Sequence, residues 1–416
     1  MPILDDTALI SLQKQLDQSL QKMLKPSSGL SRDHEALRDG YKLVKVKQGQ
    51  HLYTRTRANS PFLEVLSIGH SLQSLDDVLD LCYTPTSEEL RMVEGLVHGE
   101  KYLDAAVLET TFTATLDDPF RWFGIKFKQH FMIGGFEKRQ TTYAEYSGTT
   151  IDELGQRVLF VVRESLDQQP PASTPDVVCY KLRSVTLFTE CQNGNIQDIH
   201  YSYTDPSGKF PAWLFNQQLV IAMPITHRMT LLAQKKRLLL MAKHKPLDYE
   251  ERPTRSCSSC ADKLGVFRHK RFCLACNHVM CRRCTVKVPQ ALPMGSVAHV
   301  EFCKRCFLSA KDPNVPSQHL AWMDEDAIQF SVIARRRFYS SQPSAPPSMT
   351  PTSVPDEIKY RRSSVGYRNS SITTTASIAD LNHIEEQSPI FAQMDESIKT
   401  QRDLVEKIRS EFNRRN

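Results

Sequence analysis

The residues with the clearest chemistry are eight of the eleven cysteines, which fall into four pairs with two residues between the partners. The pairs are Cys257/Cys260, Cys273/Cys276, Cys281/Cys284 and Cys303/Cys306. Two thiolates at this spacing can reach one metal ion from a tight turn, and four thiolates enclose zinc tetrahedrally at Zn–S distances of about 2.3 Å. The pattern therefore predicts two zinc ions in closed, structural sites with no open position for catalysis, and we expect no catalytic residues and no enzyme activity.

Basic charge is concentrated around these cysteines. Residues 241–310 hold 13 Lys/Arg against 5 Asp/Glu, a balance of +8 in a chain whose net charge is +6. Cations of this kind favour anionic partners, although two zinc ions with eight thiolates sum to −4 and some cations only neutralise that cluster. Nucleic acid is the weaker interpretation, because few aromatic residues are available for base stacking. We expect no nucleic-acid partner.

The cysteine spacing resembles that of FYVE zinc fingers over residues 244–310. The resemblance implies cross-braced ligation, in which the first and third pairs hold one ion and the second and fourth pairs hold the other. The four-residue gap between the second and third pairs disfavours the alternative in which the first and second pairs share one ion and the third and fourth pairs share the other. A ubiquitin-ligase RING is also cross-braced but usually includes histidine. Here His269, His278 and His299 all lie outside the paired positions.

Recognition of phosphatidylinositol 3-phosphate in that family uses an Arg-(Arg/Lys)-His-His-Cys-Arg motif, a preceding Trp-x-x-Asp and an arginine two residues before the seventh cysteine. The aligned segment here is His269–Leu274, in which only Lys270 and Cys273 match, and Glu301 replaces the arginine. Losing two or three charge-assisted hydrogen bonds to the headgroup removes about 3–6 kcal/mol of binding free energy. The resemblance implies lipid headgroup contacts from His269, Lys270 and Arg271, and leaves specificity for the 3-phosphate open.

The resemblance also implies a membrane-inserting loop at residues 264–267, with Val266 and Phe267 entering the bilayer. This apolar tip directly precedes Arg268, and an apolar tip beside cations suits an anionic membrane surface. The implied localisation is cytoplasmic and peripheral on endosomal membranes. The N-terminal sequence carries early acids and lacks the apolar core of a secretory signal, and no apolar stretch approaches the roughly 20 residues of a membrane span.

Residues 35–243 have the sequence pattern of a domain that contains both helices and strands. Ten strand candidates rich in β-branched and aromatic residues are predicted at 42–46, 51–55, 62–68, 106–111, 125–127, 141–146, 157–163, 177–182, 185–191 and 196–203. Short helices begin near Ser74 and Ser87, and Met223–Met241 is predicted as one long helix with leucines on its apolar side. This order suggests a curved antiparallel sheet that grips the closing helix.

The stretch resembles START-like, helix-grip lipid-binding domains in the order of its elements and in the segments 117–126 and 208–214. The resemblance implies an apolar cavity between sheet and helix that holds one lipid or sterol. The same apolar residues could instead simply fill a core. The predicted fold class is α+β: a START-like domain, a small zinc-stabilised cross-brace finger and a disordered tail.

Two terminal segments flank these domains. Residues 1–34 place leucines near helical spacing and predict an amphipathic helix packed on the following domain. Residues 311–416 are low in complexity, with 20 Ser, Thr or Pro among the 38 residues 340–377, and predict disorder. Apolar residues at helical spacing over 390–412 predict a terminal helix that could form a coiled coil or dock on a partner.

Two functions from different classes follow. The first is a non-enzymatic, peripheral membrane adaptor that binds anionic lipid through the finger and a lipid in the START-like cavity. The second is a protein-interaction scaffold, because FYVE-related fingers without the basic motif can bind small GTPases through flanking helices such as Met223–Met241. Ubiquitin ligase activity is the one enzymatic alternative, since the chain lacks a phosphate-binding Gly-rich loop and a nucleophile elbow.

Overall fold

The computed structural model is described over eleven segments. These are residues 4–25, 31–47, 49–71, 75–132, 136–166, 176–191, 195–222, 228–243, 256–264, 270–292 and 295–311. The predictions of a disordered tail and a C-terminal helix lie outside them.

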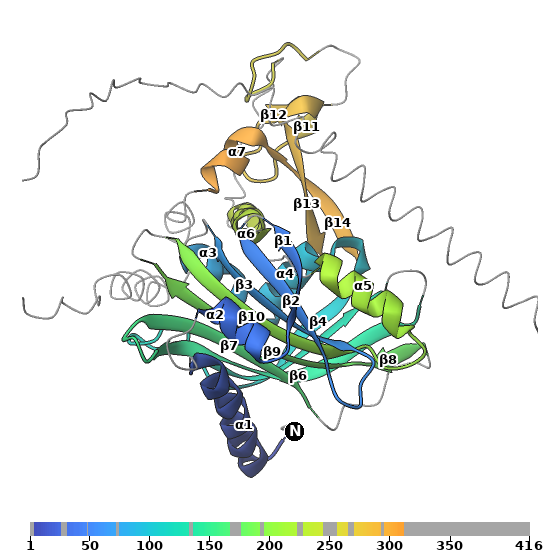
Figure 1. Ribbon diagram of the computed structural model, residues 1–416. Coiled ribbons are helices and arrows are strands. Elements are labelled where there is room, and N and C mark those ends of the chain that lie inside the picture. The colour runs from blue at the N-terminus through green and yellow to red at the C-terminus, as the bar shows by residue number, and fades with distance from the viewer. Residues whose placement is uncertain are drawn as a thin grey trace, which may run out of the picture. The chain divides into compact units, whose positions relative to one another are not determined.

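A curved sheet of ten strands forms the centre of residues 42–205, and two small hairpins follow (Figure 1). The spatial order of the sheet is β1-β2-β3-β10-β9-β7-β6-β5-β4, with β8 parallel to the start of β6. All other pairs are antiparallel. The strands are β1 Lys42–Lys47, β2 Gln50–Thr56, β3 Leu63–Ser71, β4 Tyr102–Phe112, β5 Trp122–His130, β6 Lys138–Ile151, β7 Arg157–Ser165, β8 Val177–Cys179, β9 Lys181–Glu190, β10 Ile196–Asp205, β11 Arg271–Phe272, β12 Val279–Met280, β13 Thr285–Ala291 and β14 Val297–Cys303.

Helices cover both faces of the sheet. They are α1 Asp6–Leu24, α2 Arg32–Arg38, α3 Leu75–Cys82, α4 Ser87–His98, α5 Ala212–Ala222, α6 Met229–Lys243 and α7 Lys304–Ser309, with short 3-10 turns η1 Gly99–Lys101 and η4 Arg282–Cys284. Among the described residues, no helix combines the length and apolar character needed to cross a membrane.

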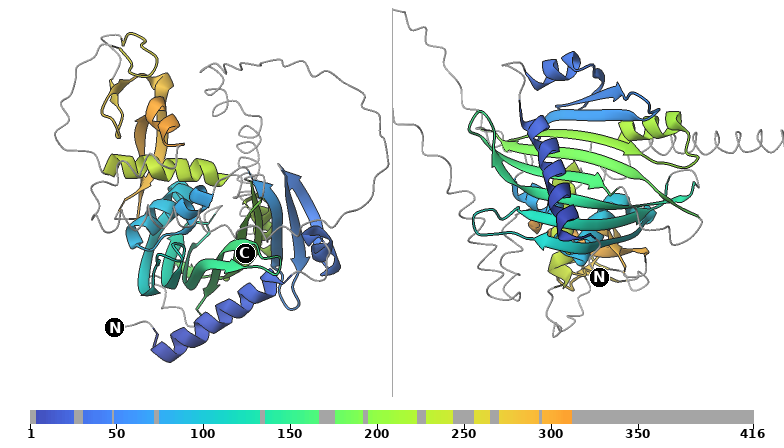
Figure 2. Two further views of the ribbon diagram at one scale, coloured as in Figure 1. Left: turned by 90° about the vertical axis from the view of Figure 1, so that its left-hand side faces the viewer. Right: turned by 90° about the horizontal axis from the view of Figure 1, so that it is seen from below.

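The outer face of the sheet, which α1 crosses, is apolar (Figure 2). The Asp5 carboxylate caps α1 by accepting a hydrogen bond from the Ala8 N–H, and Leu16 and Leu20 are buried against the sheet. Their partners are alternate residues of the central strands, including Phe160 and Val162 of β7. Because side chains of a strand alternate between faces, the intervening residues point to the opposite, inner face.

The inner face lies under α3, α4, α5 and α6 (Figure 2). The predicted single helix Met223–Met241 is wrong in its bounds: α5 ends at Ala222 and α6 begins at Met229. Pro224 lies between them, and proline both lacks the N–H for a helical hydrogen bond and disfavours helical backbone in the residue before it. The α+β fold class and the helix-grip arrangement, with helices held against one face of an antiparallel sheet, are confirmed.

Candidate metal centre and inner face of the sheet

The eight paired cysteines converge on two points in the finger. Cys257, Cys260, Cys281 and Cys284 form one group, and Cys273, Cys276, Cys303 and Cys306 form the other. Within each group the sulfur atoms all lie within 4.8 Å of one another. The first pair is therefore combined with the third and the second with the fourth, as in the cross-brace that the resemblance implied.

The geometry of both groups fits a tetrahedral ion. Sulfur atoms at about 2.3 Å from a central zinc stand about 3.8 Å apart at the corners of a tetrahedron. The Cys260 and Cys281 Sγ atoms lie 3.8 Å apart, and so do those of Cys276 and Cys303. Four thiolates around one point would repel one another, and a bound cation relieves that repulsion, so the donor set is compatible with a metal ion in each group.

Two short hairpins build these groups. β11 pairs with β12, placing Cys273 just after one strand and Cys281 just after the other. β13 pairs with β14, and its register sets Thr285 opposite Cys303. The left-handed backbone of Ala261 and Asn277 (φ 60° and 56°) turns the chain one residue after the second cysteine of the first and second pairs. Each of these two pairs thus presents both sulfurs to one side.

The predicted headgroup residues are only partly available. Arg271 donates to the Glu301 carboxylate, so its guanidinium is engaged within the finger. Lys270 is exposed and forms no ion pair within the described residues. His269, Val266 and Phe267 lie outside the described residues. Glu301, which the sequence placed where the family has arginine, thus neutralises the neighbouring cation of the motif.

The finger is packed on the helices that cover the inner face. The Arg237 guanidinium of α6 binds the Asp77 and Asp80 carboxylates of α3 at 2.7 and 2.6 Å, and it donates to the Ala310 carbonyl after α7 at 3.4 Å. Gln234 donates to the Phe307 carbonyl. Burial alone would lower the pKa of Arg237, but the two carboxylates raise it above its ordinary value.

The β13–β14 hairpin continues this contact along α4. A Cβ on Gly95 of α4 would lie 2.9 Å from the Ala291 Cβ, so only glycine admits the hairpin at this distance. Ala291 and Val297 also pack against buried Leu90 and Tyr102. This interface joins two units that the sequence predicts as separate domains.

The middle of the inner face carries charged side chains, which differs from the apolar lining that the resemblance implied. Lys126 of β5 is fully buried and donates to the Glu145 carboxylate of β6 and, at 2.9 Å, to the Thr84 hydroxyl. Arg163 of β7 donates through Nε to Glu145 at 2.6 Å. These residues could not be recognised from the sequence, because polar residues in a strand indicate a second face without telling whether water or a helix covers it.

Arg163 is the centre of this cluster. Its other guanidinium nitrogens make no hydrogen bond within the described part of the chain, and 28% of its side chain remains accessible. Burial would raise the pKa of Glu145, but Lys126 and Arg163 lower it below its usual value. Burial and then Arg163 lower the pKa of His200 to about 4, so this imidazole is neutral near pH 7.

Comparison with known proteins gives similarities in structure only. No family model matches the chain, and no curated protein matches its sequence. Residues covering 48% of the chain align with 99% of a STAR-related lipid transfer protein fragment from Xanthomonas axonopodis at 18% identity and a TM-score of 0.36. Human StAR-related lipid transfer protein 5 aligns over 56% of this chain and 97% of its own at 12% identity and a TM-score of 0.40.

A third solved structure, human STARD10, aligns over 51% of this chain and 81% of its own length at 11% identity and a TM-score of 0.35. The fold assignment for this chain stands on its own strand order and on the helices held against the inner face.

Proposed function

We propose that the protein is a non-enzymatic, zinc-stabilised lipid-binding protein that acts at membrane surfaces. Its START-like domain takes a lipid between the inner face of the sheet and the covering helices, and its finger holds two zinc ions. The observation that carries the proposal is the partly accessible Arg163, enclosed between sheet and helices with unused hydrogen-bond donors.

The charge of the inner face favours a lipid with a polar or anionic headgroup over a sterol. Lys126 and Arg163 both pair with the carboxylate of Glu145, whereas Lys128 pairs with Glu94. The cluster around Glu145 therefore sets two cations against one carboxylate. An enclosed charge is costly unless it is paired, and a ligand anion supplies the missing partner.

The finger's role in this proposal is structural and electrostatic. Eight thiolates in two closed groups hold two zinc ions and stabilise the finger. With Arg271 engaged by Glu301, we propose that the finger responds to the negative charge of a membrane and not specifically to phosphatidylinositol 3-phosphate. The scaffold alternative loses support, because α6 is mostly buried by α3, α4 and the finger and offers little surface to a small GTPase.

The experiment is native mass spectrometry of the purified chain for bound lipid, followed by transfer of fluorescent phospholipid and sterol between vesicles. Arg163→Met should weaken phospholipid binding about 10- to 100-fold, the loss of one charge-assisted hydrogen bond. Arg183→Met is the matched control. Arg183 of β9 also pairs with a glutamate, Glu164 of β7, but this pair lies on the outer face of the sheet. Equal effects of the two substitutions, or no lipid binding by the unchanged chain, would contradict the proposal.

A further inference from the structure

The edge strand β1 carries exposed apolar side chains and three lysines along one border of the sheet; Lys42 is exposed, and Lys45 and Lys47 are half-buried. In the described part of the sheet, β1 pairs with β2 on one side and with no strand on the other. Its sequence alternates lysine with aliphatic residues, and Leu43, Val44 and Val46 are 48%, 45% and 58% exposed. We call residues 42–47 the basic edge.

The charge of this border is one-sided. From Tyr41 to Leu63 the chain has five Lys/Arg and no Asp or Glu. Two of the five are engaged: Arg55 pairs with Glu64, and Arg57 lies over the Tyr203 ring. The three lysines of the basic edge form no ion pair within the described residues. At the opposite border, β4 contains two acids and no Lys or Arg.

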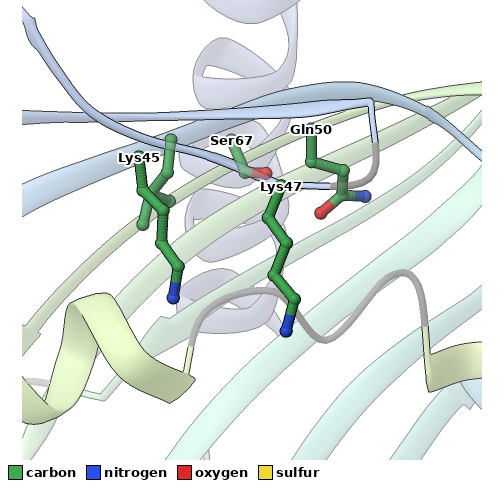
Figure 3. A pocket seen from close by; sticks show the side chains of 5 residues that line it. Lys45, Lys47, Gln50 and Ser67 are labelled. Atoms are coloured by element: carbon green, nitrogen blue, oxygen red, sulfur yellow. The ribbon is translucent and has the colours of Figure 1, made fainter. Parts of the chain in front are cut away.

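Lys45 and Lys47 do not form a small-molecule site. Figure 3 shows both side chains extending in the same direction from β1, beside Gln50 and Ser67. The hollow that they line with Leu52 measures only about 10 Å³, room for a single water. A partner of these lysines therefore contacts them from outside this hollow.

We propose that the basic edge is the surface through which the sheet domain contacts an anionic bilayer; this inference rests on the proposed lipid-binding function and gives it an orientation. Lysines beside an anionic surface each contribute about 1 kcal/mol, and exposed aliphatic side chains between them can enter the headgroup region. Lysine alone at an edge strand can serve to block strand pairing. Three exposed aliphatic residues on the same strand would promote strand pairing and not prevent it. This favours a membrane as the partner of the basic edge.

The position of the basic edge also suits lipid exchange. α5 packs on Leu52 and Val65 of the neighbouring strands through Leu219 and Val220, and its Ile221 is exposed. The basic edge therefore lies at the border where α5 covers the inner face. Contact with a bilayer here brings one end of the space between sheet and helices to the membrane.

The test is flotation of the full chain with vesicles of phosphatidylcholine alone and with phosphatidylserine added. Lys45→Gln/Lys47→Gln should weaken binding to the anionic vesicles about 30-fold, with a smaller loss at high salt. Val44→Ser/Val46→Ser should weaken binding at every salt concentration. The matched control is Lys14→Gln/Lys22→Gln, which removes the same charge from exposed positions on α1.

The outcomes separate the two proposals. Equal weakening by both lysine pairs, or no weakening by Lys45→Gln/Lys47→Gln while the unchanged chain floats, overturns the basic edge and leaves the proposed function standing. If the chain carries a bound lipid but fails to float with either kind of vesicle, the membrane contact in the proposed function and the basic edge are both overturned. Light scattering that shows a dimer abolished by the Val44→Ser/Val46→Ser variant identifies a second copy of the chain as the occupant and also overturns the inference.

Discussion

Arg237 is the most connected charged residue between the finger and the helices of the sheet domain. Its side chain is 1% exposed, and its partners Asp77 and Asp80 are 8% and 16% exposed. Arg237→Met keeps most of the side-chain volume but removes the hydrogen bonds that Arg237 donates to the two carboxylates and to the Ala310 carbonyl. We expect the substitution to destabilise α3, α6 and the end of the finger together.

The magnitude follows from the burial of the ion pairs. Removing one partner of a buried pair destabilises a protein by about 3–5 kcal/mol, because the remaining charge is left without compensation. For a domain of this size, each kcal/mol lowers the melting temperature by about 2–4 °C, so we expect a decrease on the order of 10 °C. The matched control is Lys243→Met on the same helix. Lys243 pairs with Glu88 at 2.7 Å, but both side chains are about half exposed, so the loss should be at most about 1 kcal/mol.

The measurement is thermal unfolding of the zinc-loaded chain, with hydrogen exchange to locate the effect. Arg237→Met should speed amide exchange in α3 and α7 as well as in α6, whereas Lys243→Met should not. A melting temperature that falls equally in both variants would refute the reasoning. So would faster exchange confined to α6.

Three further predictions concern the metal groups, the buried imidazole and the finger interface. Cys257→Ser should reduce bound zinc from two ions per chain to one by elemental analysis, whereas Cys82→Ser, outside both groups, should leave two. Because the pKa of His200 falls from 6.5 to about 4 on folding, the unfolded chain binds the extra proton between these values. The free energy of unfolding should therefore decrease as the pH falls from about 6.5 to 4, by up to ~3 kcal/mol from this group, and urea titrations of His200→Gln should show a shallower decrease. Gly95→Ala should lower the melting temperature, since the added Cβ lies 2.9 Å from that of Ala291, and adding Ala291→Gly should restore part of the loss; an unchanged single variant would show that the hairpin can shift freely.

Much of the sheet could be predicted from the sequence because its strands are rich in β-branched and aromatic residues. The predicted segments 157–163 and 196–203 lie within β7 and β10, where apolar residues face α1 on every second position. The cysteine spacing predicted the two metal groups for a similar reason, since a short local pattern sets their geometry. In both cases the information lies in residues that are close in sequence.

The helices at the end of the domain could not be predicted in this way. In residues 212–222 the amides Asn216–Gln218 interrupt the apolar residues, so the segment lacks the one-sided pattern that indicates a surface helix, yet it forms α5. In α6 the expected apolar side fails at Leu231, which is exposed, while Lys236 and Arg237 are buried. Charges become buried there because partners from α3 and the finger reach them, and such partners are far away in sequence.

The finger's packing on α4 and α6 explains how so small a unit is stabilised. A module of about 55 residues buries too little apolar surface to be strongly stable alone, and metal ions supply part of the deficit. The remainder comes from a shared core: Val286, Val288 and Phe302 of the finger belong to the same buried cluster as Leu238 and Leu239 of α6. Since α6 also packs on α3 over the inner face, the helix that covers the proposed lipid site is held on one side by the sheet domain and on the other by the finger. One helix therefore contacts both the finger and the helices that cover the inner face.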